Sequence, residues 1–381
     1  MASPLNNPAP AHLLSMTLDE LTDSLTADGE KPFRARQIVQ WVFGKGATCF
    51  AEMTDLSQPL RDRLARRFDI YTSTIVRRAA SRDGTVKLLL QWPDGATSEC
   101  VTIPTDGRFT ACVSSQVGCP VGCRFCASGL GGLQRNLTTG QIVEQVLRAC
   151  EQAGAAGGRL SNIVFMGLGE PLANYDVVIQ AVRLINAPWG LNIGARKITI
   201  STVGLPNQIR RLADAGLQLN LALSLHAPND RLRGELIPWA RRIAMSDLRK
   251  ACQDYFEQTG REITLEYILL RGVNDQPHHA RELADFAHAL RCNVNLLRYN
   301  PVDGLPYQRP SSQAAHAFQE ALRTHGVNSH IRRSRGLDIE AACGQLRRRQ
   351  MQDENAAQSD PAEAGQGRSA VVLGTQPAAG H

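Results

Sequence analysis

Three cysteines, Cys119, Cys123 and Cys126, form a CxxxCxxC triplet within the stretch GCPVGCRFCASG. With 10 cysteines in 381 residues, chance alone would place about 0.007 such triplets in the chain. Three closely spaced thiolates suit an iron–sulfur cluster that keeps one iron without a protein ligand. Such an iron is open to a small molecule, so the triplet predicts a reaction site.

Other uses of closely spaced thiols fit the sequence less well. A structural zinc site needs four ligands, and the sequence offers no second CxxC to complete one. A redox-active pair would need only Cys123 and Cys126 and would leave Cys119 without a role. Structural disulfides are typical of small secreted domains, whereas this long chain begins with no basic segment followed by an apolar stretch. We therefore expect a cytoplasmic protein with reduced thiols.

The composition is that of a globular enzyme-sized protein, with 43% hydrophobic and 20% charged residues. No segment approaches the run of about 20 apolar residues that a membrane helix needs. The formal net charge of +6 suits a polyanionic partner. Arginines cluster at Arg332, Arg333 and Arg335 and again at 347–349. A solvated basic face would have the same composition, so the charge alone identifies no partner.

The elements that must position the triplet are expected from the periodicity of the chain. Residues 1–12 are expected to be a flexible N-terminus, and residues 13–71 repeat apolar side chains at helical spacing, which predicts a small helical accessory domain. Residues 72–108 are rich in β-formers and contain Asp-Gly pairs that end at Gly84 and Gly95. This pattern predicts a β-hairpin-like connection.

From there, residues 109–346 alternate short β-like runs with six helical patterns. This alternation predicts an α/β fold with a parallel sheet. Six units favour a partial (β/α)6 barrel, although the spacing alone is also compatible with an open nucleotide-binding sheet. CPVGC, GLGEP, STVG, SLHAPND and YNPVDG each follow a β-like run, which is where barrel enzymes carry their functional residues. Residues 347–381 are polar and rich in Ala, Gly and Ser, which predicts a disordered tail.

The cysteine triplet and GLGEP, residues 167–171, resemble motifs of the radical S-adenosylmethionine (SAM) enzymes. In that family the CxxxCxxC loop follows the first strand of a partial barrel. The resemblance implies a 4Fe-4S cluster held by Cys119, Cys123 and Cys126, with SAM bound to the fourth iron and cleaved by one electron to a 5′-deoxyadenosyl radical. A Rossmann-like glycine turn is the alternative for GLGEP, but GxGxxG is not completed here.

Several further motifs narrow the resemblance. CVSSQVGC, ISTVG, LSLHAPND, YNP, RGLDIEAACGQL and, in the helical part, FRARQIVQW are similar to the RNA adenine methyltransferases of the RlmN/Cfr type, so the match covers about residues 13–346. The resemblance implies methylation of an adenine ring carbon, carbon 2, in 23S ribosomal RNA and in transfer RNA, with carbon 8 as the alternative. These carbons are electrophilic, so ordinary displacement from SAM cannot methylate them, whereas radical chemistry can.

The resemblance also assigns roles to three residues outside the triplet. Cys343, in AACGQL, would take a methyl group from one SAM, and a second SAM would supply the radical that activates it. The RNA would then be joined covalently to Cys343 until Cys112 releases it by forming a disulfide with Cys343. Glu99, in SECVTIP, would take the proton from the adenine carbon.

Residues at the ends of the β-like runs would contact SAM. By resemblance they are Gly169, Glu170, Ser201, Ser224, Leu225, His226 and Asn300. Taken alone, His226 would be interpreted as an ordinary histidine at a strand end, and Ser201 as a turn residue. Five cysteines fit none of these roles and are expected to be mostly buried small hydrophobes: Cys49, Cys100, Cys150, Cys252 and Cys292.

Three departures from the family pattern leave the substrate open. Leu133 stands where the carbon-2 enzymes tend to carry Phe, LIPWARRI replaces a Pro-Ile-Asn-Arg-like run, and Arg298 stands where Pro is common. They weaken the choice between carbon 2 and carbon 8 and between ribosomal and transfer RNA. We further expect an electron donor such as flavodoxin or ferredoxin, no membrane partner and a monomer. The rival hypotheses are an RNA-binding protein with structural zinc and a radical-SAM enzyme acting on a small molecule.

Overall fold

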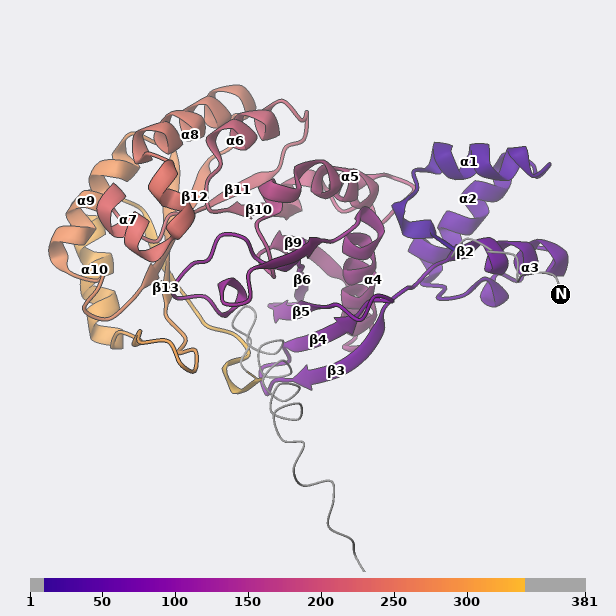
Figure 1. Ribbon diagram of the computed structural model, residues 1–381, viewed down its shortest axis with the longest axis horizontal. Coiled ribbons are helices and arrows are strands. Elements are labelled where there is room, and N and C mark those ends of the chain that lie inside the picture. The colour runs from indigo at the N-terminus through magenta and orange to yellow at the C-terminus, as the bar shows by residue number, and fades with distance from the viewer. Residues whose placement is uncertain (1–9, 340–381) are drawn as a thin grey trace, which may run out of the picture.

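The computed structural model describes residues 10–339 and consists of a small helical domain beside a larger α/β unit (Figure 1). The helical domain contains α1 (Leu18–Ala27), α2 (Phe33–Val39), a π-helical turn (Gln40–Gly44) and α3 (Gln58–Arg67). Its two ends pair in parallel as β1 (Ala11–His12) and β2 (Phe68–Asp69). Helix α1 begins with a capping box, in which Glu20 N donates to Thr17 Oγ1 (3.2 Å) and Thr17 N donates to Glu20 Oε2 (2.7 Å).

Glu144, on α4 (Thr139–Ala155), anchors the helical domain to the α/β unit. Its carboxylate is fully buried and accepts hydrogen bonds from Thr72 N (2.9 Å), Thr72 Oγ1 (3.0 Å), Ser73 N (2.9 Å) and Ser73 Oγ. Arg148 and His12 lie 3.8 and 3.4 Å from its oxygens. Burial lowers the pKa of His12, and the charge of Glu144 acts against this shift. The linker between the two parts is therefore fixed by one buried, well-partnered carboxylate.

The main sheet has ten strands in the order β14-β13-β12-β11-β10-β9-β6-β5-β4-β3. Its antiparallel part is a meander of β3 (Thr74–Ala80), β4 (Val86–Gln91) and β5 (Thr97–Thr105). The turns between these strands contain the predicted glycines, Gly84 with φ 82° and Gly95 with φ 79°. The stretch expected as a hairpin-like connection thus carries three strands, and β5 pairs with β6, so they continue the sheet of the barrel. The domain boundaries proposed from the sequence stay predictions.

The parallel part confirms the predicted α/β partial barrel. Its strands are β6 (Arg108–Cys112), β9 (Leu160–Phe165), β10 (Ile198–Thr202), β11 (Asn220–Ser224), β12 (Ile263–Leu269), β13 (Cys292–Arg298) and β14 (Ser329–Arg332). The helices that connect them, besides α4, are α5 (Tyr175–Asn186), α6 (Pro206–Ala213), α7 (Asp230–Leu236), α8 (Met245–Thr259), α9 (Pro277–His288) and α10 (Ser312–Thr324). The sheet curves, and most of these helices lie along its outer side (Figure 1).

One expected strand is split. The run FTACVSSQV ends as β6 at Cys112, and β7 (Gln116–Gly118) instead pairs antiparallel with β8 (Leu133–Asn136). Ser114 lies between them and bonds to residues that are distant in the sequence: Ser114 N donates to Gln145 Oε1 (2.9 Å) and Ser114 Oγ donates to Glu99 O (2.6 Å). Side-chain bonds replace the strand ladder here, and the chain turns across the end of the barrel.

The apolar side chains form two clusters. The larger one, here called the main core, lies between the sheet and its helices and extends into the helical domain. The smaller one, here called the mouth cluster, consists of Val121, Phe125, Ala127, Val203, Ala227, Leu232, Leu236, Ile237, Ala240, Leu270, Tyr299 and Val302. Within residues 10–339, no helix is long and apolar enough to cross a membrane.

Candidate active site at the carboxyl end of the sheet

The loop that carries the cysteine triplet follows β7 and packs on the mouth cluster. Cys119, Cys123 and Cys126 are each half-buried. Two backbone bonds fix the loop, from Cys119 N to Gly132 O (2.9 Å) and from Cys126 N to Cys123 O (3.1 Å). Burial raises the pKa of Cys119 to about 12, and burial together with the neighbouring Cys126 and Cys119 sulfurs holds the pKa of Cys123 well above its usual value. The three cysteines thus share one fixed loop, although the described residues contain no set of three or more His, Cys, Asp or Glu side chains placed around a single ion position.

Arg233, on α7, is a buried cation next to this loop. It is 1% exposed, and its Nη2 donates to Val203 O, but Nε and Nη1 have no hydrogen-bond partner among the described residues. Burial lowers the pKa of Arg233 to about 10, and the nearby Cys123 acts in the opposite direction. A buried charge with unmade hydrogen bonds is costly, so the position calls for an anion. Three thiolates with a bound cluster, or the carboxylate of SAM, would supply one, and the donor set therefore fits both groups.

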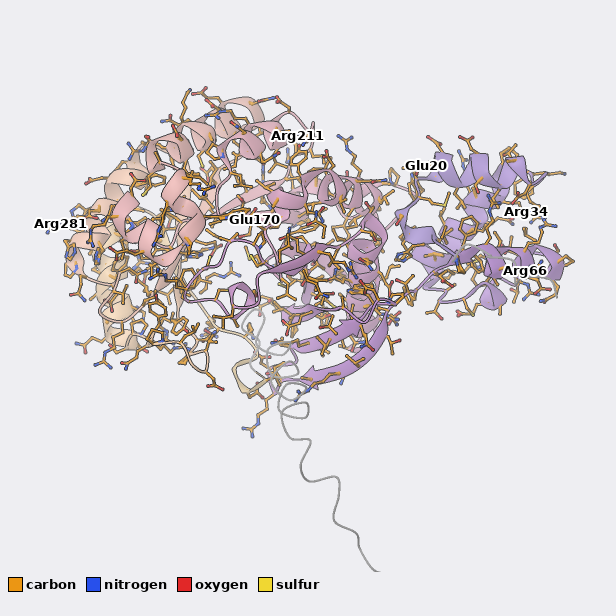
Figure 2. The ribbon with its side chains drawn as sticks, in the orientation of Figure 1. Glu20, Arg34, Arg66, Glu170, Arg211 and Arg281 are labelled. Carbon is orange, nitrogen blue, oxygen red and sulfur yellow. The ribbon has the colours of Figure 1, made fainter. Side chains whose placement is uncertain are left out.

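Gly169 and Glu170 follow β9 and lie against the loop before the triplet. Gly169 has φ 103°, and a Cβ at this position would lie 2.6 Å from Gln116 Cβ, so only glycine fits. Glu170 lies in the interior of the α/β unit, unlike the labelled Arg211 and Arg281 at its rim (Figure 2). Its carboxylate accepts from Val203 N (2.8 Å) and from the N–H of Leu172 (3.0 Å). Burial raises the pKa of Glu170 to about 7.

The ends of β10 and β11 bring further predicted residues to the same edge. Ser201 Oγ and Ser224 Oγ lie 3.1 Å apart. His226 has the unusual φ of 59°, and its Nδ1 accepts from Ile268 N (3.1 Å). Burial lowers the pKa of His226 to about 3, so its ring is neutral at physiological pH. The Phe125 ring of the cysteine loop meets the His226 ring edge-on, with centroids 5.1 Å apart, so this histidine directly supports the loop.

Leu225 and Asn300 complete the set expected to contact SAM. The Leu225 side chain is buried in the main core, and its N–H donates to Glu266 O (3.0 Å). Asn300, just beyond β13, is half-buried, and its Oδ1 accepts from Arg309 Nη1 (2.6 Å). The carboxyl ends of parallel strands meet at one edge of the sheet. The predicted residues therefore gather at the edge that carries the cysteine loop, while their contacts with SAM stay a prediction.

The antiparallel part contributes a second group on its inner face. In the strand register, Val101 of β5 lies opposite both Lys87 of β4 and Cys112 of β6. Glu99 lies two residues from Val101 and so points to the same face. Cys100 points to the opposite face and packs in the main core. Lys87, Glu99 and Cys112 are 0%, 4% and 8% exposed, so the sheet brings an ammonium, a carboxylate and a thiol together in the interior.

Electrostatics at Cys112 follow from these neighbours. Burial raises the pKa of Cys112 to about 12. A hydrogen bond with the Met166 backbone and the charge of Lys87 lower it, whereas Cys100 and Glu99 raise it.

The sequence analysis did not predict two buried charged residues of the site, Lys87 and Arg233. Lys87 could have been found because it is a charged residue within an apolar run, VKLLLQ, that is typical of a buried strand.

Cys343 lies outside the described residues, so its position is not compared with that of Cys112. The segment that leads to it is held against the turn between β3 and β4. Gly336 N donates to Asp83 Oδ2 (2.9 Å), Arg82 N donates to Asp338 Oδ2 (3.0 Å), and Ser81 Oγ donates to Asp338 Oδ1. The last described residues therefore contact the antiparallel part of the sheet, whose strand β5 carries Glu99.

The remaining cysteines differ among themselves. Cys100 and Cys252 are buried in the main core, as expected, and Cys150 and Cys292 pack against it half-buried. Cys49 is exposed. It precedes a short 3-10 helix, and its Sγ donates to Glu52 Oε1 (3.3 Å). It is therefore not a core residue.

The fold and the site together define a radical SAM enzyme, and comparison with known proteins agrees. The sequence profile of the Radical SAM superfamily matches residues 113–287, and that of the "Ribosomal RNA large subunit methyltransferase N-terminal domain" matches residues 11–70. The crystal structure of a radical SAM methyltransferase from Sphaerobacter thermophilus superimposes with a TM-score of 0.86 at 46% identity, covering 88% of this chain and 99% of that one.

Curated relatives narrow the family. A Rhodopirellula baltica protein named "Probable dual-specificity RNA methyltransferase RlmN" is 50% identical over 90% of this chain and 92% of its own length. The Bacillus subtilis protein of the same name is 45% identical over 90% and 94%. The chain belongs to the RlmN family of radical SAM RNA methyltransferases. This membership confirms the predicted enzyme class, and the alternative of a non-catalytic zinc protein finds no support in it.

Proposed function

We propose that the protein methylates carbon 2 of adenine in RNA, with 23S ribosomal RNA as one substrate and transfer RNA as a second. The observation that carries this proposal is the inner face of the sheet, where Glu99 and Cys112 lie on neighbouring strands of the barrel that carries the thiol loop. A carboxylate and a thiol at this place match the base and the releasing thiol that such a reaction needs. The dual specificity printed in the relatives' names supports two RNA substrates.

The thiol loop and the strand ends would hold the two cofactors. Cys119, Cys123 and Cys126 would bind a 4Fe-4S cluster, and the cluster with SAM would supply a radical that abstracts hydrogen from a methyl group. Arg233 would donate from Nε and Nη1, which have no hydrogen-bond partner within residues 10–339, to the negative charge there. The mouth cluster excludes water around these groups. SAM would lie against Gly169, Glu170, Ser201, Ser224, Leu225, His226 and Asn300.

The remaining residues would carry the group transfer. Cys343 would receive the methyl group of one SAM as an S-methylcysteine and, once activated at the expense of a second, would bond through its methylene carbon to the adenine ring. The adduct would carry one unpaired electron, which would return to the oxidised cluster, and Glu99 would accept the proton that the ring carbon loses. In the last step Cys112 would lose its proton and attack the Cys343 sulfur as the thiolate: a disulfide would form, the carbon–sulfur bond would break with its electron pair on the methylene carbon, and that carbon would take up a proton to become the methyl group of the product.

Lys87 would assist the thiol that must become a thiolate. Its side chain shares the inner face with Glu99 and Cys112, and its positive charge lowers the pKa of Cys112. The electron would come from a small acidic redox protein such as flavodoxin or ferredoxin, and we place the reaction in the cytoplasm, where the thiols are kept reduced.

The test is anaerobic incubation of the reconstituted enzyme with SAM, a reductant and RNA, followed by mass spectrometry of the digested RNA. We expect 2-methyladenine; methylation at carbon 8 would favour the alternative, and unmodified RNA from enzyme with a full cluster would overturn the proposal. In a denaturing gel, Cys112→Ala should accumulate RNA linked to protein, whereas Cys343→Ala should show neither adduct nor product. Cys292→Ala, half-buried at the edge of the main core, is the matched control and should turn over normally.

A further inference from the structure

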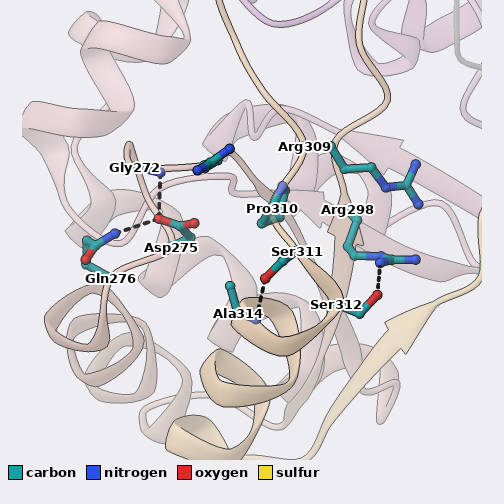
Figure 3. Close-up of a pocket in the computed structure, with 10 residues that line it drawn as sticks. Gly272, Asp275, Gln276, Arg298, Arg309, Pro310, Ser311, Ser312 and Ala314 are labelled. Atoms are coloured by element: carbon teal, nitrogen blue, oxygen red, sulfur yellow. Dashed lines mark hydrogen bonds between the residues drawn. The ribbon is translucent and has the colours of Figure 1, made fainter.

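A cavity of about 720 Å³ lies between the loops that follow β12 and β13 (Figure 3). Three arginines line it. Arg298 is the last residue of β13, Arg271 follows β12, and Arg309 lies just before α10. Arg309 also donates to Asn300, which places the cavity at the edge of the sheet that carries the candidate active site. The size is that of a site for a small molecule or one nucleotide unit.

The arginines have only neutral partners. Arg298 Nη1 donates to Ser312 Oγ (2.6 Å), Arg309 to Asn300 and Ser334, and Arg271 Nη1 to Gln308 Oε1 (3.4 Å). Within residues 10–339, none of the three forms an ion pair. The three guanidinium charges are thus not neutralised by the described part of the chain.

One carboxylate, Asp275, lines the cavity. Its Oδ1 accepts from Gly272 N and Gln276 Nε2, both at 2.9 Å. Arg298 and Arg309 extend in the same direction on the side away from Asp275 (Figure 3). Burial, and then the charge of Arg298, lower the pKa of Arg309. Two guanidinium groups held side by side repel each other, and an anion between them would offset that repulsion.

A second cavity shows what a balanced lining looks like. It has a volume of about 390 Å³ and is lined by Arg183 and Arg211 together with Asp176 and Asp214. Arg211 forms an ion pair with Asp176, so this cavity has as many carboxylates as guanidinium groups. Excess positive charge is therefore a property of the first cavity and not of arginine-lined hollows on this protein in general.

We propose that the arginine-lined cavity binds a backbone phosphate of the RNA substrate, at a nucleotide that flanks the adenine entering the active site. Guanidinium groups bind phosphate oxygens through paired N–H donors, and Arg271, which is exposed, can meet RNA without rearrangement of the core. This assignment rests on the proposed function, since it presumes an RNA substrate. It adds the place at which the sequence-independent part of RNA binding occurs.

The test measures RNA affinity of the reconstituted holoenzyme by fluorescence anisotropy over a range of salt concentrations. Arg271→Gln/Arg298→Gln should bind RNA about tenfold more weakly and reduce the slope of log affinity against log salt by about 1 to 2, because phosphate contacts release counterions. Arg183→Gln/Arg211→Gln is the matched control and should keep the slope of the unsubstituted enzyme. Formation of 5′-deoxyadenosine without RNA should be unchanged in both double variants, which shows that the fold and the cofactor site are intact.

Each other outcome overturns the inference. If Arg271→Gln/Arg298→Gln keeps the affinity and the slope, the cavity takes no RNA phosphate. If it instead slows reduction by flavodoxin while reduction by dithionite is normal, the cavity docks the acidic electron donor. The unsubstituted enzyme separates this from the proposed function: an enzyme that methylates RNA while the variant binds equally well contradicts only the cavity, whereas an enzyme that never methylates RNA contradicts the proposed function itself.

Discussion

Two buried charged side chains, Glu144 and Arg233, differ in how far their hydrogen bonds are satisfied by the residues around them. Glu144, where the helical domain meets the barrel, accepts four hydrogen bonds from Thr72 and Ser73 and has two basic side chains beside it. Arg233, at the mouth of the barrel, donates one hydrogen bond, and its Nε and Nη1 have no partner in the part of the chain that the structure describes. Both are almost completely inaccessible to water.

This difference distinguishes a buried charge that has a structural role from one that is expected to bind a ligand. A buried charge whose hydrogen bonds are all made holds elements together and needs nothing else. A buried charge with unmade bonds lowers stability unless another group completes it. The hydrogen bonds of Glu144 are thus made when the chain folds, whereas we expect those of Arg233 to be completed by a bound ligand. The following substitutions test this contrast.

The largest effect is expected in the cysteine loop of the mouth. Cys119→Ala, Cys123→Ala or Cys126→Ala should each abolish cluster assembly and SAM cleavage, because a site that already lacks one protein ligand cannot lose another. Iron analysis and 5′-deoxyadenosine formation measure this. Cys150→Ala, beside the main core, is the control and should keep its iron. Full iron content in any loop variant would contradict the assignment of the ligands.

The two buried charges should respond in opposite ways. Glu144→Ala should lower the free energy of unfolding by about 3 kcal/mol, because it strands the hydrogen-bond donors of Thr72 and Ser73, and should leave the cluster unchanged. Arg233→Met should leave the unfolding free energy of the cluster-free protein equal or higher, because it removes an uncompensated charge, yet weaken SAM binding and make the cluster potential more negative. Urea titration and redox titration measure the two effects.

Glu144→Ala is thus expected to change stability but not the cluster, and Arg233→Met to change the cluster potential without a loss of stability. A loss of stability in Arg233→Met as large as that in Glu144→Ala, with an unchanged potential, would show that the two charges play the same structural role. Arg233→Lys keeps the charge and should restore the potential in part, since a lysine cannot present the same donors.

A smaller effect concerns the pH dependence of product release. Because burial raises the pKa of Cys112 to about 12, the thiolate fraction below that pKa grows about tenfold with each pH unit, and single-turnover release should accelerate by the same factor. Lys87→Met should slow release at every pH, because the ammonium lowers the pKa of Cys112. Lys87→Arg keeps the charge and should slow it less. Release that is independent of pH would show that Cys112 is not the attacking thiol.

The smallest effect is expected farthest from the mouth. Thr17→Ala removes the side chain that caps α1 and should lower the unfolding free energy of the helical domain by about 1 kcal/mol, with no change in methyl transfer per folded enzyme. Thr26→Ala, whose hydroxyl bonds only within the same helix, is the control and should change stability less. Chemical denaturation followed by circular dichroism measures the difference.

The sequence predicts much of the mouth because its residues follow local rules. The spacing of the three cysteines is a local feature, so it can be recognised in the sequence whatever fold the rest of the chain adopts. The ends of β9, β10, β11 and β13 could be located because alternating strands and helices imply parallel neighbours, whose carboxyl ends share an edge. The capping box of α1 is an equally local feature, since Thr17 and Glu20 are three residues apart.

Other features depend on register and on distant contacts, which no local pattern encodes. Lys87 reaches Cys112 only through the pairing of three antiparallel strands, and Arg233 meets the cysteine loop only after α7 folds over the mouth. The split of the expected strand after Cys112 follows from bonds of Ser114 to Gln145 and Glu99, which are 31 and 15 residues away. Sequence periodicity cannot distinguish such a break from a continuous strand.

The order of the sheet also bears on how the chain is made. From β6 to β14 the parallel strands stand in the sheet in the order in which they are synthesised, so each new strand emerges beside a neighbour that can already have formed. The contacts of Asp338 with Ser81 and Arg82 join residues 257 and 256 positions apart. They form only when nearly the whole chain has left the ribosome, because the closing of so long a loop waits for both ends. The contacts of Asp338 are therefore among the last to form, and under the role proposed for Cys343 a nascent barrel would stay inactive until this segment has docked.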